Sequence, residues 1–192
     1  MDLEGFQPGG RAPAPPPLDL VQDFVNTEIP DFAHDELATP DELRAWLERR
    51  GLLEPDGGVD AGVFVAAREL RDVLRRLALL NTTGEAPDEP LRGRFDAALA
   101  GVALRPELGP DATVQLMPSG EGASRALGAI AAVVVGAQSS GTWRRMKACR
   151  KDGCGWLFFD ASRNCSSSWC SMSICGNRTK TTAYRRRRKA GT

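Results

Sequence analysis

Apolar residues recur at three- and four-residue spacing through most of the chain, a pattern typical of amphipathic helices. The pattern predicts helices over residues 20–25, after Thr39, over 60–80, from Pro90, and over 123–138. The second of these has the clearest start, because Thr39, Pro40 and Glu42 form a capping box with proline at the first helical position. The last is mostly Ala, Val, Leu and Ile, which favours a helix buried on several sides.

The helix over 60–80 contains four arginines, which we expect to lie largely off its apolar face: Arg68, Arg71, Arg75 and Arg76. After the Pro90 helix, Val102, Leu104, Val114 and Leu116 alternate with other residues around a Gly-Pro-Asp turn at 109–111. Alternation around a turn predicts a β-hairpin. The fold class is therefore mainly α with a small β-hairpin, in a helical domain over residues 18–142.

Residues 1–17 are rich in proline and glycine, and we expect a disordered lead there. The N-terminus lacks the charged start and apolar stretch of a secretion signal. The longest strongly apolar run, 129–137, is less than half of the roughly 20 residues that span a bilayer. These features predict a cytoplasmic protein without a membrane partner.

Charge divides the chain into two parts, although Lys plus Arg and Asp plus Glu both number 25. Residues 143–192 contain 13 basic and 2 acidic residues, a net +11, so the preceding residues have a net −11. A basic end on an acidic body suggests that this end meets a polyanion.

All five cysteines lie in the basic end, where Cys149 and Cys154 form one close pair and Cys170 and Cys175 another, with fifteen residues between the pairs. Two close pairs separated by a longer connector are the pattern of a tetrahedral zinc site, and four thiolates leave no open position for catalysis. We therefore predict one structural Zn²⁺ and exclude Cys165, which has no partner at pair spacing. The alternative is a small core of reduced cysteines. A helix is also expected after Cys175, with Asn177 as its cap, giving a treble-clef-like or ribbon-like finger over 143–192.

The segments "CRKDGCGWLFFDASRN" and "WCSMSICGNRTKTTAYRRRR" resemble the CGNR zinc finger, which is named for the tetrapeptide at 175–178. The segments "LVQDFVNT" and "LATPDELRAWLERRGLL" resemble the ABATE domain, which accompanies this finger in bacterial proteins described as stress-induced transcription regulators. The resemblance implies a mainly helical N-terminal domain and a DNA-binding finger. Carried over by position, its ligands are Cys149, Cys154, Cys170 and Cys175.

Basic residues follow the last cysteine, and we expect them to contact DNA: Arg178, Lys180, Arg185, Arg186, Arg187, Arg188 and Lys189. Lysine and arginine supply non-specific affinity by neutralising phosphates, and an arginine at a helix start can reach a guanine edge. The alternatives are a solvated tail for the distal run and, for Arg178, a structural bond to Asp160 or to connector carbonyls.

Two functions fit these features. The first is a DNA-binding transcription regulator, nucleoid-associated when bound, whose helical domain senses a small-molecule effector or mediates assembly such as a homodimer. The second is a ligand-binding protein or enzyme with a purely structural finger. We favour the first and assign no catalytic residue, because no nucleophile, cofactor box or phosphate loop accompanies the helices.

Two polar segments of the helical domain are open to several interpretations. Asn26 and Thr27 end an apolar helix, where they cap it or bind a small ligand. The acidic loop that follows is either a solvated linker or a metal or acid–base site: Glu28, Asp31, His34, Asp35 and Glu36.

Overall fold

The computed structural model describes residues 6–179, and the structural statements below concern these residues. A short helix, η1 (Pro8–Gly10), precedes the helical domain. The elements of the helical domain are α1 (Leu18–Asn26), β1 (Glu28–Ile29), η2 (Pro30–Phe32), β2 (His34–Asp35), α2 (Pro40–Arg49), α3 (Ala61–Thr83), α4 (Glu89–Leu99), β3 (Ala103–Leu108), β4 (Val114–Ser119) and α5 (Gly122–Ser139). Those of the finger are η3 (Trp143–Arg145), β5 (Met146–Ala148), β6 (Leu157–Phe159) and η4 (Met172–Gly176). The three sheets are two-stranded and antiparallel, so the mainly α fold class is confirmed.

Side chains cap the starts of α2, α3 and α4. In α2, the Thr39 hydroxyl accepts from the Glu42 amide, and the Glu42 carboxylate accepts from the Thr39 amide, so the predicted capping box is present. Asp60 and Asp88 are the N-caps of α3 and α4, where their carboxylates accept from the amides of Val63 and Leu91. Since each cap satisfies an amide that has no partner within the helix, it fixes the residue at which the helix begins.

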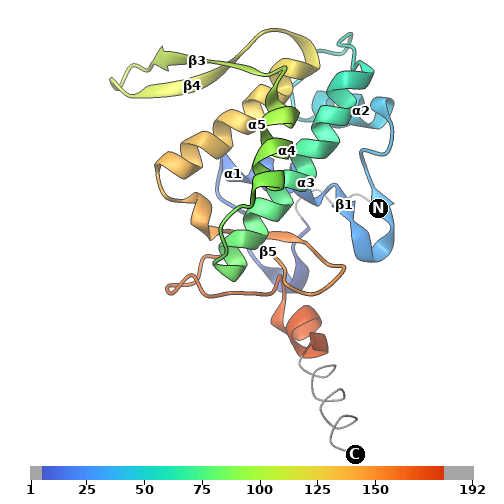
Figure 1. The fold of residues 1–192 in the computed structure, drawn as a ribbon, viewed down its shortest axis with the longest axis vertical. Coiled ribbons are helices and arrows are strands. Elements are labelled where there is room, and N and C mark those ends of the chain that lie inside the picture. The colour runs from blue at the N-terminus through green and yellow to red at the C-terminus, as the bar shows by residue number, and fades with distance from the viewer. Residues whose placement is uncertain (1–5, 180–192) are drawn as a thin grey trace, which may run out of the picture.

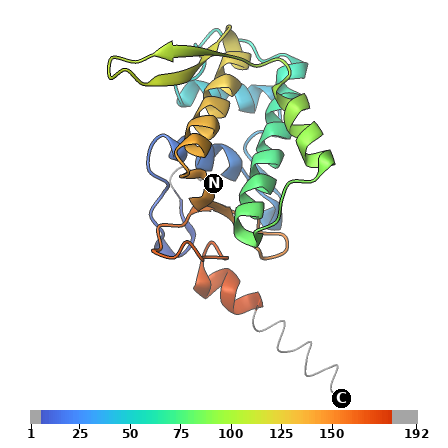
Figure 2. The same ribbon diagram turned by 60° about the vertical axis from the view of Figure 1, so that its left-hand side comes forward.

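The core lies where α1 contacts both α3 and α5, as two views of the ribbon show (Figures 1 and 2). Phe24 of α1 packs on Trp46 of α2, with ring centroids 5.6 Å apart. Leu70 of α3 and Leu127 of α5 are buried in the same cluster. Met146 and two further residues of the finger strands also belong to it. The helical domain and the finger therefore share one core.

Strands β3 and β4 form the predicted hairpin, which we call the arm (residues 103–119). The arm projects sideways from the N-terminal end of α5, at the end of the molecule opposite the finger (Figures 1 and 2). Its twelve strand residues are exposed or half-buried. The helix α5 is buried at Leu127, Ile130 and Val134 but not on all sides, since Val135 is 36% exposed.

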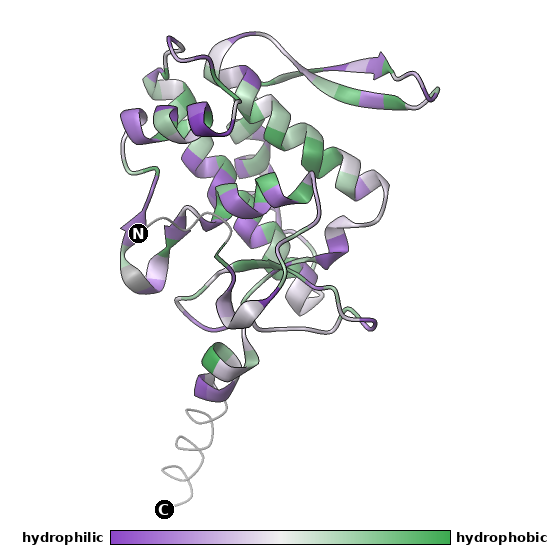
Figure 3. Ribbon diagram, turned by 180° about the vertical axis from the view of Figure 1, so that it is seen from behind, coloured by the Kyte–Doolittle hydropathy of each residue, from purple (hydrophilic) through white to green (hydrophobic). Residues whose placement is uncertain are grey.

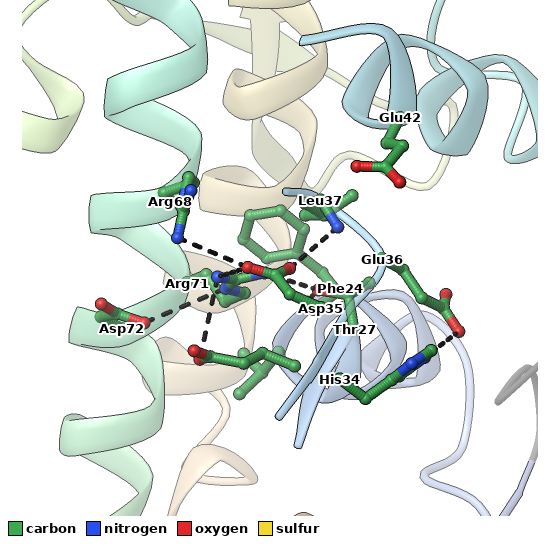
Figure 4. A network of polar contacts seen from close by, with 12 residues as sticks. Phe24, Thr27, His34, Asp35, Glu36, Leu37, Glu42, Arg68, Arg71 and Asp72 are labelled. Carbon is green, nitrogen blue, oxygen red and sulfur yellow. Dashed lines mark hydrogen bonds and ion pairs between the residues drawn. The ribbon is translucent and has the colours of Figure 1, made fainter. Parts of the chain in front are cut away.

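The acidic loop forms a short hairpin docked on α3, so it is not a solvated linker. Asp35 makes a two-pronged ion pair with Arg71, at 2.5 and 3.0 Å, and a third contact with Arg68 at 3.4 Å (Figure 4). The carboxylate of Glu28 lies 2.6 Å from Arg75. Two of its acids are thus neutralised by arginines, which leaves no cluster of acids for a metal among the described residues.

Arg71 corrects the expectation that the α3 arginines lie off the buried face, because only 1% of its side chain is exposed. It also donates to the Thr27 hydroxyl at 3.3 Å. A buried guanidinium is tolerated only when paired and hydrogen-bonded. Burial raises the pKa of Asp35, but the hydrogen bond and positive charge of Arg71 outweigh this, and the net pKa is lowered. Asp35 therefore stays ionised beside the arginine.

The expectation of a disordered lead is wrong for residues 6–17. Pro8 and Ala14 are buried, and η1 contacts η4 of the finger. We call residues 6–17 the strap. Apolar and polar residues of the strap contact the finger, and the composition of the segment does not reveal these contacts. Across the described part of the chain, none of the helices combines the length and apolarity needed to cross a bilayer.

Candidate metal centre and nucleic-acid interface

The first cysteine pair lies in the turn between β5 and β6. These strands pair Met146 with Phe159 and Ala148 with Leu157, and the Cys149 amide donates to the Trp156 carbonyl at 3.0 Å. The turn brings two thiols back towards one point. Gly153 and Gly155, on either side of Cys154, have φ values of 80° and 58°, in the left-handed region that glycine adopts without strain.

The second pair lies at the start of the finger helix. Ser171 is its N-cap, accepting from the Ile174 amide, and helical structure continues through η4 to residue 179. The prediction of Asn177 as the cap is therefore wrong, because the helix already begins between the two cysteines. A side chain at Gly176 would displace the exposed Met172 side chain and come within 3.2 Å of the Trp169 ring.

The four thiols converge as a metal site requires. Their Sγ atoms lie within 4.8 Å of one another, and those of Cys154, Cys170 and Cys175 are 3.5–3.8 Å apart. In a tetrahedral site with Zn–S bonds of about 2.3 Å, sulfur atoms are about 3.8 Å apart. All four cysteines are buried, so they are positioned to bind one metal ion in a closed site.

The thiols cannot all ionise without a cation between them. Hydrogen bonds from Cys154 and Cys170 lower the pKa of Cys149 to about 2, while the bond to Cys149 raises the pKa of Cys154 to about 12. Hydrogen bonds to Cys149 and Cys154, with burial, raise the pKa of Cys170, and burial raises that of Cys175. Because metal-binding cysteines are thiolates, a cation between them must offset a large part of their negative charge. The donor set fits Zn²⁺, which the four cysteines would hold as a structural ion.

Cys165 lies outside the cluster, as expected; its thiol is 3.6 Å from the Arg144 carbonyl. Its connector is held by a buried ion pair between Lys147 and Asp160, 3.3 Å apart and 4% and 0% exposed. Lys147 donates to the carbonyls of Cys165 and Ser167. Asp160 accepts from the amides of Ser162 and Ser167. Burial raises the pKa of Asp160, but these bonds outweigh it and the net pKa is strongly lowered.

The strap binds the second cysteine pair from outside. Arg11 donates to the carbonyls of Trp169 and Cys170, at 3.1 and 3.0 Å, and its guanidinium lies 4.5 Å from the ring centre of Phe158. Phe6 packs edge-on against Trp156. The strap thus covers the metal site and the strand beside it.

Asn26 joins the helical domain to the finger. Its amide oxygen accepts from the Leu157 amide at 2.8 Å, and its nitrogen donates to the Leu157 carbonyl at 2.9 Å. The Thr27 hydroxyl donates to the Phe24 carbonyl at 2.7 Å and so caps α1. Thr27 is therefore a helix cap, one of the two roles expected from the sequence, whereas Asn26 is a domain bridge, and these internal bonds leave the small-ligand site without support. The sequence did not reveal the bridge, since its partner is a backbone 131 residues away.

We expect Asn26→Ala to lower the free energy of unfolding by about 1–3 kcal/mol, because it leaves the buried Leu157 amide without a partner. The Leu157 carbonyl keeps a bond from Gln22, so only one group is orphaned. Urea unfolding and hydrogen exchange at the Leu157 amide measure the effect. Unchanged stability and unchanged protection of Leu157 would contradict the bridge and restore the ligand interpretation.

Further bonds attach the finger to α3 and to the acidic hairpin. Asn81 donates to the carbonyls of Trp143 and Met146, both at 2.9 Å, and Thr82 to that of Ala148 at 2.9 Å. Lys151 pairs with Asp31, an ion pair that raises the pKa of Lys151.

Arg178 is exposed, and its side chain forms no hydrogen bond or ion pair with residues 6–179. Asp160, its proposed structural partner, is bonded to Lys147, Ser162 and Ser167 instead. The other predicted DNA contacts lie outside the described residues: Lys180, Arg185, Arg186, Arg187, Arg188 and Lys189. Three further arginines of the finger are exposed but were not among the DNA contacts expected from the sequence: Arg144, Arg150 and Arg163. Arg150 directly follows a cysteine ligand, a signal that sequence reading could have used.

Comparison with known families accounts for both parts of the chain. The ABATE family model, described as "Putative stress-induced transcription regulator", matches residues 18–139. The chain belongs to the ABATE family. The CGNR zinc finger model matches residues 145–188 of this ABATE protein, in the order expected from its motifs. No curated protein matches the chain. The family match and the four converging thiols together confirm one structural zinc in a C-terminal finger.

Proposed function

We propose that this ABATE protein is a cytoplasmic transcription regulator that binds DNA through its finger and associates with the nucleoid when bound. In this proposal it is not an enzyme, and the helical domain senses a small effector or mediates assembly. The observation that carries the proposal is the exposed Arg178 in a helix that starts within the metal site. The zinc-held cysteine fixes its backbone, so the guanidinium can be directed at a base.

The charge of the finger supports the same proposal. Three of its basic side chains are used internally, because Lys147 is buried, Arg145 bonds to the Asp160 carbonyl and Lys151 pairs with Asp31. Arg144, Arg150, Arg163 and Arg178 are exposed and have no ion pair with a described residue. Exposed arginines that form no ion pair within the protein keep their positive charge and therefore attract phosphates.

Removal of the basic run Arg185–Lys189 is expected to weaken the salt dependence of DNA binding. Truncation after Tyr184 removes five positive charges. If about three of them contact phosphates, the slope of log affinity against log salt falls by about 2.7. Fluorescence anisotropy with a random-sequence duplex measures the slope, and truncation after Lys189, which removes only Ala190–Thr192, is the matched control. An equal slope in the two truncated proteins would make the run a solubility tail.

Arg178→Ala is expected to lose about 1–3 kcal/mol of discrimination between DNA selected from a random library and unselected DNA. Arg178→Lys is the matched control, since it retains the charge but lacks the planar two-pronged donor. It should bind unselected DNA as the wild type does and still lose discrimination. A lower melting temperature with unchanged discrimination would make Arg178 a structural residue.

A second candidate function is a ligand-binding protein or enzyme whose finger is only structural. The many bonds between the helical domain and the finger favour this second function, because Asn26, Asn81 and Thr82 all donate to carbonyls of the finger. It predicts no salt-dependent binding to any member of a random DNA library. The selection experiment that supplies DNA for the Arg178 comparison therefore separates the two functions.

A further inference from the structure

The two cysteine pairs of the metal site are held in different ways. The first pair lies in the turn of the β5–β6 sheet, and Met146 and Leu157 of these strands belong to the core shared with the helices. Figure 3 shows these hydrophobic strands where the finger meets the helical domain. Of the described residues after Phe159, none belongs to that core. The second pair, Cys170 and Cys175, therefore depends on other contacts to stay in place.

The strap supplies such contacts through Arg11. The Arg11 guanidinium donates to the carbonyl of Cys170 at 3.0 Å and to that of Trp169 at 3.1 Å, and it lies over the ring of Phe158. A rigid planar group attached at three points fixes the backbone of Cys170, and so the direction from which its thiolate reaches the metal. One zinc ion with four thiolates keeps a net negative charge, which a neighbouring guanidinium stabilises.

The strap also lies directly on Ser171, between the two cysteines of this pair. A β-carbon at Gly9 would lie 2.6 Å from the Ser171 Oγ and 3.0 Å from its Cβ, so only glycine lets the strap come this close. The Ser171 carbonyl accepts from the amides of Cys175 and Gly176, at 2.9 and 3.1 Å. The strap thus contacts the residue that organises the loop between Cys170 and Cys175.

The strap itself is held by a few side-chain bonds to α1 and the finger. The Ala14 amide donates to the Gln22 carbonyl oxygen at 2.6 Å, and the Gln22 nitrogen donates to Gln7 at 3.0 Å. Gln7 also accepts from the Trp156 ring nitrogen at 3.4 Å. Only three of the twelve strap residues are buried: Gln7, Pro8 and Ala14. A segment attached in this way, without strand pairing, opens at a lower free energy than the core.

We propose that the strap controls zinc release: while it is bound, the second cysteine pair stays closed, and its detachment is the step that lets zinc leave. For zinc to leave, each thiolate must exchange the metal for a proton or for a competing ligand. Cys149 is fixed by its backbone bond to Trp156 within the sheet, whereas Cys170 is fixed by the strap. Cys170 and Cys175 therefore release the metal first. The inference concerns the metal site alone and does not depend on DNA binding.

Transfer of zinc from the loaded full chain to an excess of a chromogenic chelator tests the proposal. Arg11→Ala removes the attachment to the second pair without changing a ligand, and we expect it to speed zinc release by at least about tenfold. Arg49→Ala is the matched control, since it removes the same charge from an exposed position of α2, at the end of the molecule opposite the finger (Figure 1). It should release zinc at the wild-type rate. Equal rates in the two variants would overturn the proposal.

A second pair of variants moves the strap and leaves Arg11 in place. Gly9 and Gly10 have φ values of 72° and 69°, so alanine causes similar backbone strain at both positions. Only at Gly9 would the new β-carbon meet Ser171, because nothing lies within 4 Å of one at Gly10. We expect Gly9→Ala to release zinc several-fold faster than Gly10→Ala. Equal release rates would contradict a role of the contact with Ser171.

Hydrogen exchange of the zinc-loaded proteins separates detachment of the strap from a general loss of stability. In Arg11→Ala, the amides of Cys175 and Gly176 should exchange faster, because they are bonded within the loop that the strap covers. The Leu157 amide, which is bonded to Asn26 in the shared core, should keep its wild-type protection. An equal loss of protection at Leu157 would show that the whole finger loosens, and the proposal would be wrong.

Discussion

Cys170→Ser is expected to abolish zinc binding and to unfold the finger. Structural zinc contributes about 10–16 kcal/mol in small finger peptides, and three thiolates cannot close the site. The effect extends beyond the finger, because Met146, Ala148 and Leu157 belong to the core shared with the helices. We therefore expect the melting temperature of the whole chain to fall, with zinc content measured by elemental analysis. Prolonged chelation of the wild type should have the same effect.

Cys165→Ser is the matched control for this experiment. The substitution is the same and lies in the same finger, but the Cys165 thiol is outside the cluster and only half-buried. Zinc content and melting temperature should stay at their wild-type values. Loss of zinc from the Cys165 variant, with retention in the Cys170 variant, would overturn the assignment of the ligands.

Asp160→Ala is expected to destabilise the folded chain by about 3–5 kcal/mol, because it leaves Lys147 buried without its carboxylate. The pair is only 4% and 0% exposed, so water cannot replace the lost partner. The variant also removes the acceptor for the Ser162 and Ser167 amides, which hold the connector between the cysteine pairs. Urea unfolding of the zinc-loaded proteins measures the loss, and zinc release to a chelator should be faster.

Asp152→Ala is the control, since Asp152 is exposed in the same finger and its removal should change stability by less than about 0.5 kcal/mol. A double variant tests the pairing itself. If Lys147→Ala is combined with Asp160→Ala, the loss should be smaller than the sum of the two single losses, since neither charge is left alone. Additive losses would show that the two residues act independently.

The sequence by itself determined the elements that depend on local chemistry. The cap of α2, the hairpin around the turn at 109–111 and the helix before the finger were all predicted, because each depends on residues within a few positions of one another. The metal site was predicted for a related reason. Each cysteine pair closes a short loop, and its spacing is visible in the chain.

Contacts between distant segments were decided only by the tertiary structure. The composition of the strap predicts disorder, yet Arg11 donates to carbonyls that lie 158 and 159 residues away in the sequence. The sequence predicts that Arg71 lies on the surface of α3, but its bonds to Asp35 and Thr27 offset the cost of burying its charge. Asn26 reads as a helix end or ligand contact, and its partner is the backbone of a finger strand. In each case the stabilising interaction is made with a partner that sequence spacing does not identify, so only the folded chain reveals the role of the residue.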